Sequence, residues 1–342
     1  MTIAGSLFGL AFGDAMGKPT EFAKFETLQK AYKSGWLDEL PVKNGIAKVT
    51  DDTQMALSVG LAVTTAAENG FLTPENVADE LATQFTAWYQ SPDNTADRAP
   101  GNACMTAASG MSRGKPWWEC TKLDAKGCGA NMRVTPIGLC DWLTMEQRSG
   151  IAQLQAAMTH WHPTALAASD VTQYAVHLLL HGADHEDLLD LLLNYVSVAS
   201  TYDTSEWIGE LYDEHGKSTG REGVDQWMGK GWFETRQAIL KVKRAWKSPR
   251  KIDRKADPCR VGGEGWVAEE ALATALHCYL MFPDDGARVV ARAAATGGDS
   301  DSIAALAGAF AGASLGMRGF PVEWTGQIEY RVQLEGLALR LS

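Results

Sequence analysis

Apolar residues recur along most of this chain at the spacing of three to four positions that buries one face of a helix. The clearest example includes Val77, Leu81 and Phe85. Thr73 and Pro74 stand directly before it, a side-chain cap and a residue suited to the first helical turn, so a helix is predicted to begin there. The same spacing predicts helices over residues 55–67, 188–198 and 269–281.

Two further helices are predicted to be thin and deeply buried. At the start of the chain, a glycine recurs at every fourth position from Gly5 to Gly17. On a helix these glycines share one face and let another backbone approach closely, although glycine otherwise destabilises a helix. Asp14 lies beside them, which indicates a polar role at a crowded place. A helix predicted after Asp301 consists largely of alanine and glycine over residues 304–313.

No stretch alternates between apolar and polar residues over a useful length, so no sheet is predicted and the fold class is all-α. No repeat of fixed period and no low-complexity tract interrupts the chain. Residues 204–258 differ from the rest, because they are polar and rich in tryptophan before they turn basic. We interpret them as an insertion or peripheral region of a single domain that spans residues 1–342.

Composition narrows the class of protein. The 342 residues carry a formal net charge of -11, which disfavours binding to the backbones of DNA or RNA. No apolar run reaches the roughly 20 residues that a membrane helix needs, and the N-terminus lacks the basic segment of a signal peptide. The six cysteines form no C-x-x-C pair and are typical of reduced thiols. A cytoplasmic protein without nucleic-acid or membrane partners is expected.

Two acidic clusters lie far apart in the sequence, each directly before a predicted helix. They comprise residues 50–53 and 297–302, and each holds two aspartates beside hydroxyl side chains. One interpretation is capping, because Asp, Ser and Thr suit helix N-termini and the helix dipole stabilises negative charge there. The other is metal binding, because a helix start needs one cap whereas each cluster offers paired carboxylates. Spacing alone leaves both interpretations open.

The second interpretation has a chemical consequence. If the clusters meet in space, four carboxylates share a small volume and cannot all stay ionised without cations. Hard divalent ions with oxygen ligands, Mg²⁺ or Mn²⁺, meet that need. A pair of such ions can hold and acidify a water molecule and orient a polyhydroxy substrate. The sequence contains neither a phosphate-binding P-loop motif nor G-x-G-x-x-G, so an enzyme built on a nucleotide-binding loop is not expected.

Seven segments, taken in order, make the sequence recognisable. They are GSLFGLAFGDAMGKPTEF, VTDDTQM, RAPGNAC, GCGANMRVTPIG, THWHP, GGEGWVAEEAL and GGDSDSIAALAGAFAGA. Through these segments, from Gly5 to about Gly316, the chain resembles the ADP-ribosylglycohydrolase family. The resemblance implies a compact, orthogonal bundle of helices around a binuclear site that holds two Mg²⁺ ions, with Mn²⁺ as a possible substitute.

The resemblance also implies roles for individual residues. The implied metal ligands are Thr50, Asp51, Asp52, Asp299, Asp301 and Ser302. The implied catalytic residues are Asp51, Asp52, Glu21 and Asp301, with Glu21 as a mobile acid near the metals. The implied contacts with ADP-ribose are Asn102, Gly127, Cys128, Gly129, Asn131, His160 and Trp266, with residues 127–129 offering backbone N–H groups to the diphosphate.

The sequence departs from the family pattern at three of these positions. Cys128 stands where many members have asparagine, Ser302 where threonine is common, and Asn131 where the residue is usually apolar. Ser302 keeps a hydroxyl ligand, so the metal site is intact, but the substrate preference is left open. Without the resemblance, Cys128 would be a candidate nucleophile, Trp266 a core residue and His160 a residue that satisfies a helix end.

The function implied by the resemblance is hydrolysis of the bond between ribose C1″ and a modified protein side chain, with arginine preferred. The partners would be an ADP-ribosylated protein and ADP-ribose. The alternatives are a hydrolase of ADP-ribosyl-serine or O-acetyl-ADP-ribose, and a non-catalytic member that binds ADP-ribose or serves as a crystallin. Reversal of a regulatory modification and immunity against an ADP-ribosylating toxin are both compatible with the family.

Overall fold

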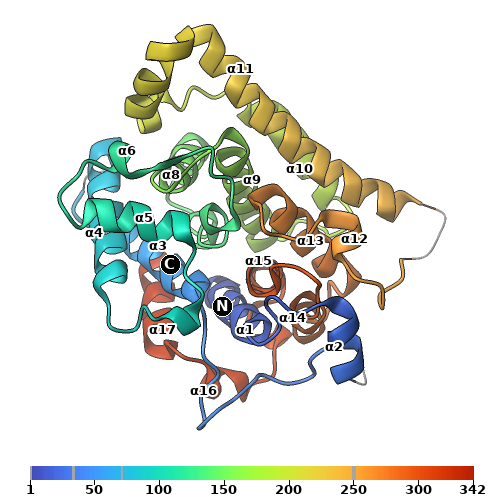
Figure 1. The fold of residues 1–342 in the computed structure, drawn as a ribbon. Coiled ribbons are helices and arrows are strands. Elements are labelled where there is room, and N and C mark those ends of the chain that lie inside the picture. The colour runs from blue at the N-terminus through green and yellow to red at the C-terminus, as the bar shows by residue number, and fades with distance from the viewer. Residues whose placement is uncertain (1, 33–34, 71, 249–251) are drawn as a thin grey trace.

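The computed structural model describes residues 2–32, 35–70, 72–248 and 252–342, and these are mostly helical (Figure 1). The α-helices are α1 (Thr2–Gly17), α2 (Phe25–Ala31), α3 (Asp51–Glu68), α4 (Pro74–Gln90), α5 (Asn102–Met111), α6 (Trp117–Cys120), α7 (Thr135–Gly138), α8 (Met145–Ala157), α9 (Pro163–Leu180), α10 (Leu188–Ala199), α11 (Ser205–Lys247), α12 (Cys259–Gly262), α13 (Ala268–Met281), α14 (Gly286–Ala294), α15 (Ser300–Leu315), α16 (Trp324–Gln327) and α17 (Arg331–Leu341). The 3₁₀ helices are η1 (Ala96–Arg98), η2 (Cys128–Ala130) and η3 (Gly316–Gly319). Strands β1 (Lys122–Leu123) and β2 (His160–Trp161) pair in parallel. The predicted all-α fold class is confirmed.

Helices α1 and α15 lie side by side at the centre of the molecule (Figure 1). Their backbones touch: a Cβ atom added to Gly9 would overlap the carbonyl of Gly308, and one added to Gly13 would overlap the carbonyl of Ala304. The contact is reciprocal, because a Cβ atom on Gly312 would overlap the carbonyl of Gly5. The glycines at every fourth position of α1 therefore allow the close approach of two backbones that their spacing predicts.

The two helices run in opposite directions, so the last turn of α1 lies beside the first turn of α15. A Cβ atom on Gly17 would overlap the backbone of Asp301. The Ser300 hydroxyl donates to the Gly17 carbonyl at 3.1 Å, and the Thr20 hydroxyl lies 3.0 Å from that of Ser300. The turn that follows α1 is thereby fixed against the start of α15.

The helices predicted from the sequence are present in the structure. Helix α4 begins at Pro74, and the Thr73 side chain accepts a hydrogen bond from the N–H of Asn76 at 3.3 Å. Helices α10 and α13 match their predicted ranges to within one residue. Helix α3 begins at Asp51, earlier than predicted, because the acidic cluster itself forms its first turn. Among the described residues, no helix combines the length and apolar character needed to cross a membrane.

Helix α11, residues 205–247, runs along one edge of the molecule in Figure 1. It packs against α8, α9 and α13, and its contact with α9 is close, since a Cβ atom on Gly231 would overlap the backbone of Pro163. The interpretation of residues 204–258 as an insertion or peripheral region of one domain stays a prediction. Residues 249–251 of that region lie outside the described residues.

Replacing Gly13 with alanine is expected to lower the free energy of unfolding by about 3 kcal/mol, because the added methyl group must push α1 and α15 apart. Gly336 in α17 is the matched control, since a Cβ atom there would meet nothing within 4 Å. Gly336→Ala should be neutral or stabilising by about 0.5–1 kcal/mol. Urea unfolding followed by circular dichroism measures both variants. Equal stability of the two would contradict the close contact.

Candidate functional site

The two acidic clusters meet at one cavity of about 600 Å³. Asp51 and Asp52 reach it from the first turn of α3, and Asp299 and Asp301 reach it from the start of α15. Glu21, in the turn after α1, lines the same cavity. Five carboxylates from three segments of the chain therefore share one small space, where they cannot all stay ionised without cations.

The start of α3 is held in place by Asp14, a fully buried residue of α1. Its carboxylate accepts hydrogen bonds from the backbone N–H groups of Thr50 at 2.8 Å and Thr53 at 3.0 Å, and from the Thr53 hydroxyl at 2.5 Å. Thr50 caps α3, because its side chain accepts from the N–H of Asp52 at 3.3 Å. Thr50 therefore caps α3, whereas Asp51 and Asp52 line the cavity.

Burial and mutual repulsion act together on the carboxyl groups. Burial raises the pKa values of Asp51, Asp52 and Asp299 well above their usual range. The negative charge of Asp301 is the second cause at each of the three. The same two causes raise the pKa of Glu21 to about 9. None of the salt bridges formed by the described residues involves these groups, so protons or bound cations must offset their charge.

The residues present fit hard divalent cations. The Oδ2 atom of Asp52 is buried and has no hydrogen-bond partner within the described part of the chain, which is costly unless a cation binds it. The ligand atoms offered around the cavity are carboxylate oxygens and the Ser302 hydroxyl, the types that Mg²⁺ and Mn²⁺ prefer. Thr50 is fully buried behind this set and does not line the cavity.

Most of the residues predicted to contact ADP-ribose form another part of the cavity wall. They are Asn102, Gly127, Cys128, Gly129, His160 and Trp266. The parallel pairing of β1 with β2 carries His160 to this wall, since Lys122 of β1 lies opposite it and the glycine loop follows β1. A Cβ atom on Gly127 would lie 3.3 Å from His160 Nε2, so the loop and the ring are in close contact.

Two residues of this predicted set are engaged elsewhere. The N–H of Cys128 donates to the carbonyl of Trp266 at 3.1 Å, so the prediction that it is offered to a diphosphate is wrong. This N–H is engaged because Gly127 in the loop and Val267, just before α13, form an isolated antiparallel β-bridge. Asn131 is fully buried away from the cavity, and its amide donates to the Ala268 carbonyl at 3.0 Å. Burial raises the pKa of the Cys128 thiol well above its usual range, which argues against a nucleophile.

Phe22 and Trp266 form an aromatic pair at the cavity. Their rings are stacked with centroids 5.4 Å apart and planes 16° apart. Phe22 is 72% exposed and Trp266 is 39% exposed, so neither is a core residue. Phe22 also has a φ of +63°, a backbone conformation that bulky residues rarely adopt. The pair therefore presents a flat apolar surface to which a planar part of a ligand can bind.

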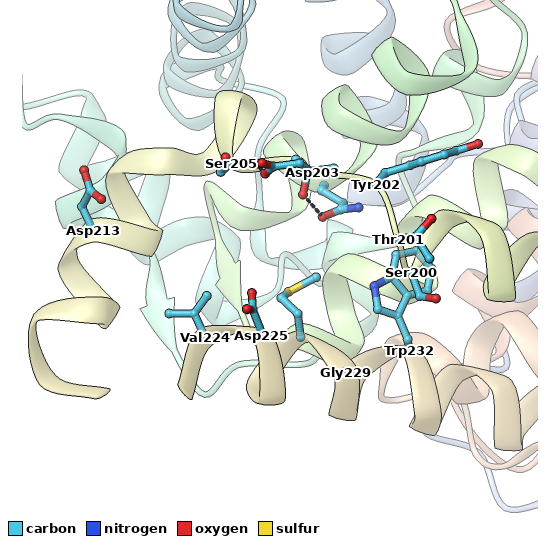
Figure 2. A pocket seen from close by; sticks show the side chains of 13 residues that line it. Ser200, Thr201, Tyr202, Asp203, Ser205, Asp213, Val224, Asp225, Gly229 and Trp232 are labelled. Carbon is cyan, nitrogen blue, oxygen red and sulfur yellow. Dashed lines mark hydrogen bonds between the residues drawn. The ribbon is translucent and has the colours of Figure 1, made fainter. Parts of the chain in front are cut away.

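A second cavity, of about 820 Å³, lies between the segment that links α10 to α11, the start of α11, and residues 224–232 in the middle of α11 (Figure 2). Asp203, Asp213 and Asp225 are among its lining residues (Figure 2). The described residues that line it include no lysine or arginine. A cavity of this charge does not suit an anionic ligand, and none of its residues lines the cavity that holds the five carboxylates.

One cluster of possible metal ligands was not predicted. Single ligand atoms of Asp141, His177 and His181 lie within 4.8 Å of one another. Arg148 lies 3.2 Å from His177 Nε2, so this nitrogen accepts from the guanidinium and the ring proton lies on Nδ1, the atom nearer Asp141. A metal would have to displace that proton. The H-x-x-x-H spacing on α9 is the sequence signal for the cluster, which does not line the carboxylate cavity.

The sequence pattern of the ADP-ribosylglycohydrolase family matches residues 2–342. The chain belongs to the ADP-ribosylglycohydrolase family. The resemblance carried by the seven segments is therefore confirmed. Family membership supports a metal-dependent hydrolase that acts on ADP-ribosyl conjugates.

Individual relatives of this family member cover nearly its whole length. It is 26% identical over 339 residues to ADP-ribosyl-dinitrogen reductase glycohydrolase of Rhodospirillum rubrum, which covers 97% of this chain and 91% of that protein. It is 23% identical over 343 residues to ADP-ribosylarginine hydrolase Tri1 of Pseudomonas putida, covering 98% of this chain and 76% of that protein. A solved ADP-ribosylglycohydrolase-related protein complex matches the fold with a TM-score of 0.66 and 22% identity, covering 99% and 96% of the two chains.

The sequence does not reveal the buried residues that support the cavity-lining residues through hydrogen bonds. It identifies Asp14 only as a polar residue in a crowded helix, yet Asp14 anchors the start of α3. It does not single out Arg133 or Thr159, although both lie directly behind His160. Arg133 belongs to the recognised segment GCGANMRVTPIG, and an arginine within an otherwise uncharged motif is the signal that marks it.

Replacing Asp301 with asparagine removes the charge that raises the pKa values of its carboxyl neighbours. With a chelator present, Asp301→Asn is expected to raise the melting temperature by a few degrees, because like-charge repulsion falls. With Mg²⁺ present, the wild type should gain more than the variant, because an amide binds this cation more weakly than a carboxylate does. Differential scanning calorimetry measures both shifts.

The control is Asp38→Asn, since Asp38 is exposed and does not line the cavity. It should change neither melting temperature. A variant at position 301 that melts below the wild type in chelator would show that like-charge repulsion is not the main effect of Asp301 on stability.

Proposed function

We propose that this protein is a binuclear metal-dependent hydrolase that removes ADP-ribose from modified protein side chains, with arginine preferred. The observation that carries the proposal is the convergence of five carboxylates on a cavity whose remaining wall holds His160 and a glycine-flanked loop. The acids suit a pair of cations, and the loop suits a ligand that approaches the backbone closely.

The proposed metal ligands come from the two clusters. Two Mg²⁺ ions, or Mn²⁺, would be held by Thr50, Asp51, Asp52, Asp299, Asp301 and Ser302. When bound, these cations acidify a water molecule and orient the hydroxyls of the ribose. The buried, unpartnered Oδ2 atom of Asp52 supports this assignment. Thr50 is the weakest member of the set, because its hydroxyl already caps α3.

The proposed position of ADP-ribose follows the other wall. At Gly127 and Gly129 the absence of side chains lets a diphosphate approach the main chain. Burial lowers the pKa of His160 to about 3, so its ring is neutral and binds through hydrogen bonds. The stacked pair of Phe22 and Trp266 offers a surface for the adenine or a ribose.

The proposed reaction adds water across the bond between C1″ and the guanidino nitrogen. Glu21, Asp51 or Asp52 accepts one proton of the water while its oxygen bonds to C1″. The C1″–N bond breaks, its electron pair stays on nitrogen, and the nitrogen takes up the proton. The products are ADP-ribose with a hydroxyl at C1″ and an unmodified arginine. The three carboxyls stay alternatives for the base.

Two points support arginine as the preferred acceptor. One relative, aligned over 98% of this chain, is named an ADP-ribosylarginine hydrolase. The cavity lining is also acidic on balance, since Asp124 lines it together with the five carboxylates, against one lysine, Lys122. A negative field favours the approach of a cationic guanidinium over that of a neutral serine side chain.

Other functions of the same cavity remain alternatives. A hydrolase of ADP-ribosyl-serine or O-acetyl-ADP-ribose would differ only in the leaving group. A non-catalytic member would bind ADP-ribose without turnover, and the complete carboxylate set argues against that. A cytoplasmic location, and a role in regulation or toxin immunity, stay predictions.

The test is release of ADP-ribose from arginine-linked and serine-linked substrate proteins, with Mg²⁺ and with a chelator. The wild type should act faster on the arginine linkage and lose its activity in chelator. Asp301→Ala should lower kcat/KM by about a hundredfold to a thousandfold, because a group that stabilises the transition state is lost. Asp225→Ala, which removes an acid from the cavity in Figure 2, should leave kcat/KM unchanged.

Three results would contradict parts of this proposal. Full activity of Asp301→Ala with Mg²⁺ would reject the site. Equal or faster cleavage of the serine linkage would reject the arginine preference. Calorimetric binding of ADP-ribose without turnover of any linkage would favour the non-catalytic alternative.

A further inference from the structure

Arg133 is fully buried, and its guanidinium is surrounded by acceptors. Its Nε donates to the side-chain oxygen of Gln155 at 2.6 Å, and its Nη2 donates to the Gln155 carbonyl at 2.5 Å and the Thr159 hydroxyl at 2.8 Å. Its Nη1 faces the sulfur atoms of Met55 at 3.5 Å and Cys104 at 3.4 Å. No salt bridge within the described ranges includes it, so no carboxylate pairs with it directly.

The Thr159 hydroxyl connects this guanidinium to His160. Its Oγ1 atom lies 2.7 Å from His160 Nδ1 and 3.5 Å from the carbonyl oxygen of Ala156. A guanidinium has only donors and keeps its protons in a protein, so Thr159 Oγ1 must accept from Arg133. The single hydroxyl proton then goes to the nearer acceptor, His160 Nδ1. The proton of a neutral His160 ring therefore lies on Nε2, as assigned from this network.

The Nε2 atom of His160 lies at the wall of the carboxylate cavity. Cβ atoms added to Gly127 and Gly129 would lie 3.3 Å and 3.4 Å from it. Within the described residues, the one side-chain hydrogen bond of this ring is made by Nδ1. Burial, followed by the charges of Arg133 and Lys122, lowers the pKa of His160 to about 3, so the neutral ring offers one N–H donor.

The same guanidinium also fixes the glycine loop. Because Arg133 Nε occupies the side-chain oxygen of Gln155, the amide nitrogen of Gln155 points the other way and donates to the Ala130 carbonyl at 2.8 Å. Ala130 directly follows Gly129 in the loop. Arg133 thus positions the loop and the His160 ring relative to each other through two separate hydrogen-bond paths.

We propose that Arg133 and Thr159 are positioning residues that hold His160 as its Nε2–H tautomer, so that it presents a hydrogen-bond donor to a phosphate or ribose oxygen of the ligand. This inference rests on the function proposed above, because the ligand is ADP-ribose. The other neutral tautomer would turn a lone pair toward the same oxygen and repel it. A fixed donor offsets part of the unfavourable field that the carboxylates impose on an anion.

The tautomer can be observed by two-bond ¹H–¹⁵N correlation NMR of protein labelled with ¹⁵N-histidine, with His160→Ala identifying the signals of His160. The wild type should show the Nε2–H form. Thr159→Val keeps the shape of the side chain but removes the hydroxyl, so His160 should populate both tautomers. The Kd for ADP-ribose, measured by calorimetry, should then rise about tenfold. Thr159→Ser keeps the hydroxyl and should restore both properties.

Thr172→Val is the matched control, because Thr172 is also fully buried and its hydroxyl has no partner within the described residues. It should change neither the tautomer nor the Kd. An Nδ1–H signal in the wild type, which needs no variant to fold, or an unchanged tautomer in Thr159→Val, would overturn the proposal. A changed tautomer with an unchanged Kd would overturn the positioning role. If the wild type binds no ADP-ribose, the proposed function fails while the tautomer still tests the hydrogen-bond path.

Discussion

Direct contact between the backbones of α1 and α15 determines where the acidic residues of this protein lie. The contact exists only because glycines occupy the shared face, as at Gly13, where a methyl group would overlap the opposite helix. With the helices touching, the turn after α1 brings Glu21 to the start of α15. Asp14 of α1 accepts hydrogen bonds from backbone N–H groups at the start of α3. One helix pair thus fixes all three segments that carry the carboxylates.

The cavity has two walls of opposite electrostatic character. On one wall, burial and then mutual repulsion raise the pKa values of the acids. On the other wall, the neutral imidazole of His160 supplies a hydrogen-bond donor, and the buried guanidinium of Arg133 lies behind it. The acidic wall suits cations and the donor wall suits an anion. A ligand that carries both a diphosphate and ribose hydroxyls matches that division, and cations that bind the acids also relieve the repulsion between them.

A structural feature can be predicted from the sequence when the residues that cause it are neighbours in the chain. Thr73 and Pro74 predict the start of α4 because capping involves neighbours in the chain. The spacing of the two acidic clusters leaves capping and metal binding open, and only the fold brings them to one cavity. Asn131 lies inside a recognised segment, yet no local pattern reveals that it faces α13 instead of the ligand. Gln155 and Thr159, which accept hydrogen bonds from Arg133, are 22 and 26 residues away from it, beyond the reach of any helix or turn pattern.

The pairing of α1 with α15 joins parts of the chain that lie far apart in the sequence. Helix α1 covers residues 2–17, whereas α15, on which it rests, begins at residue 300. The entropy of closing so long a loop grows only slowly with length, so the finished fold tolerates the separation. Until α15 packs against α1, however, the glycine face of α1 stays exposed and neither Asp299 nor Asp301 is held near Glu21. The cavity that holds the five carboxylates is therefore complete only once these two distant helices have packed together.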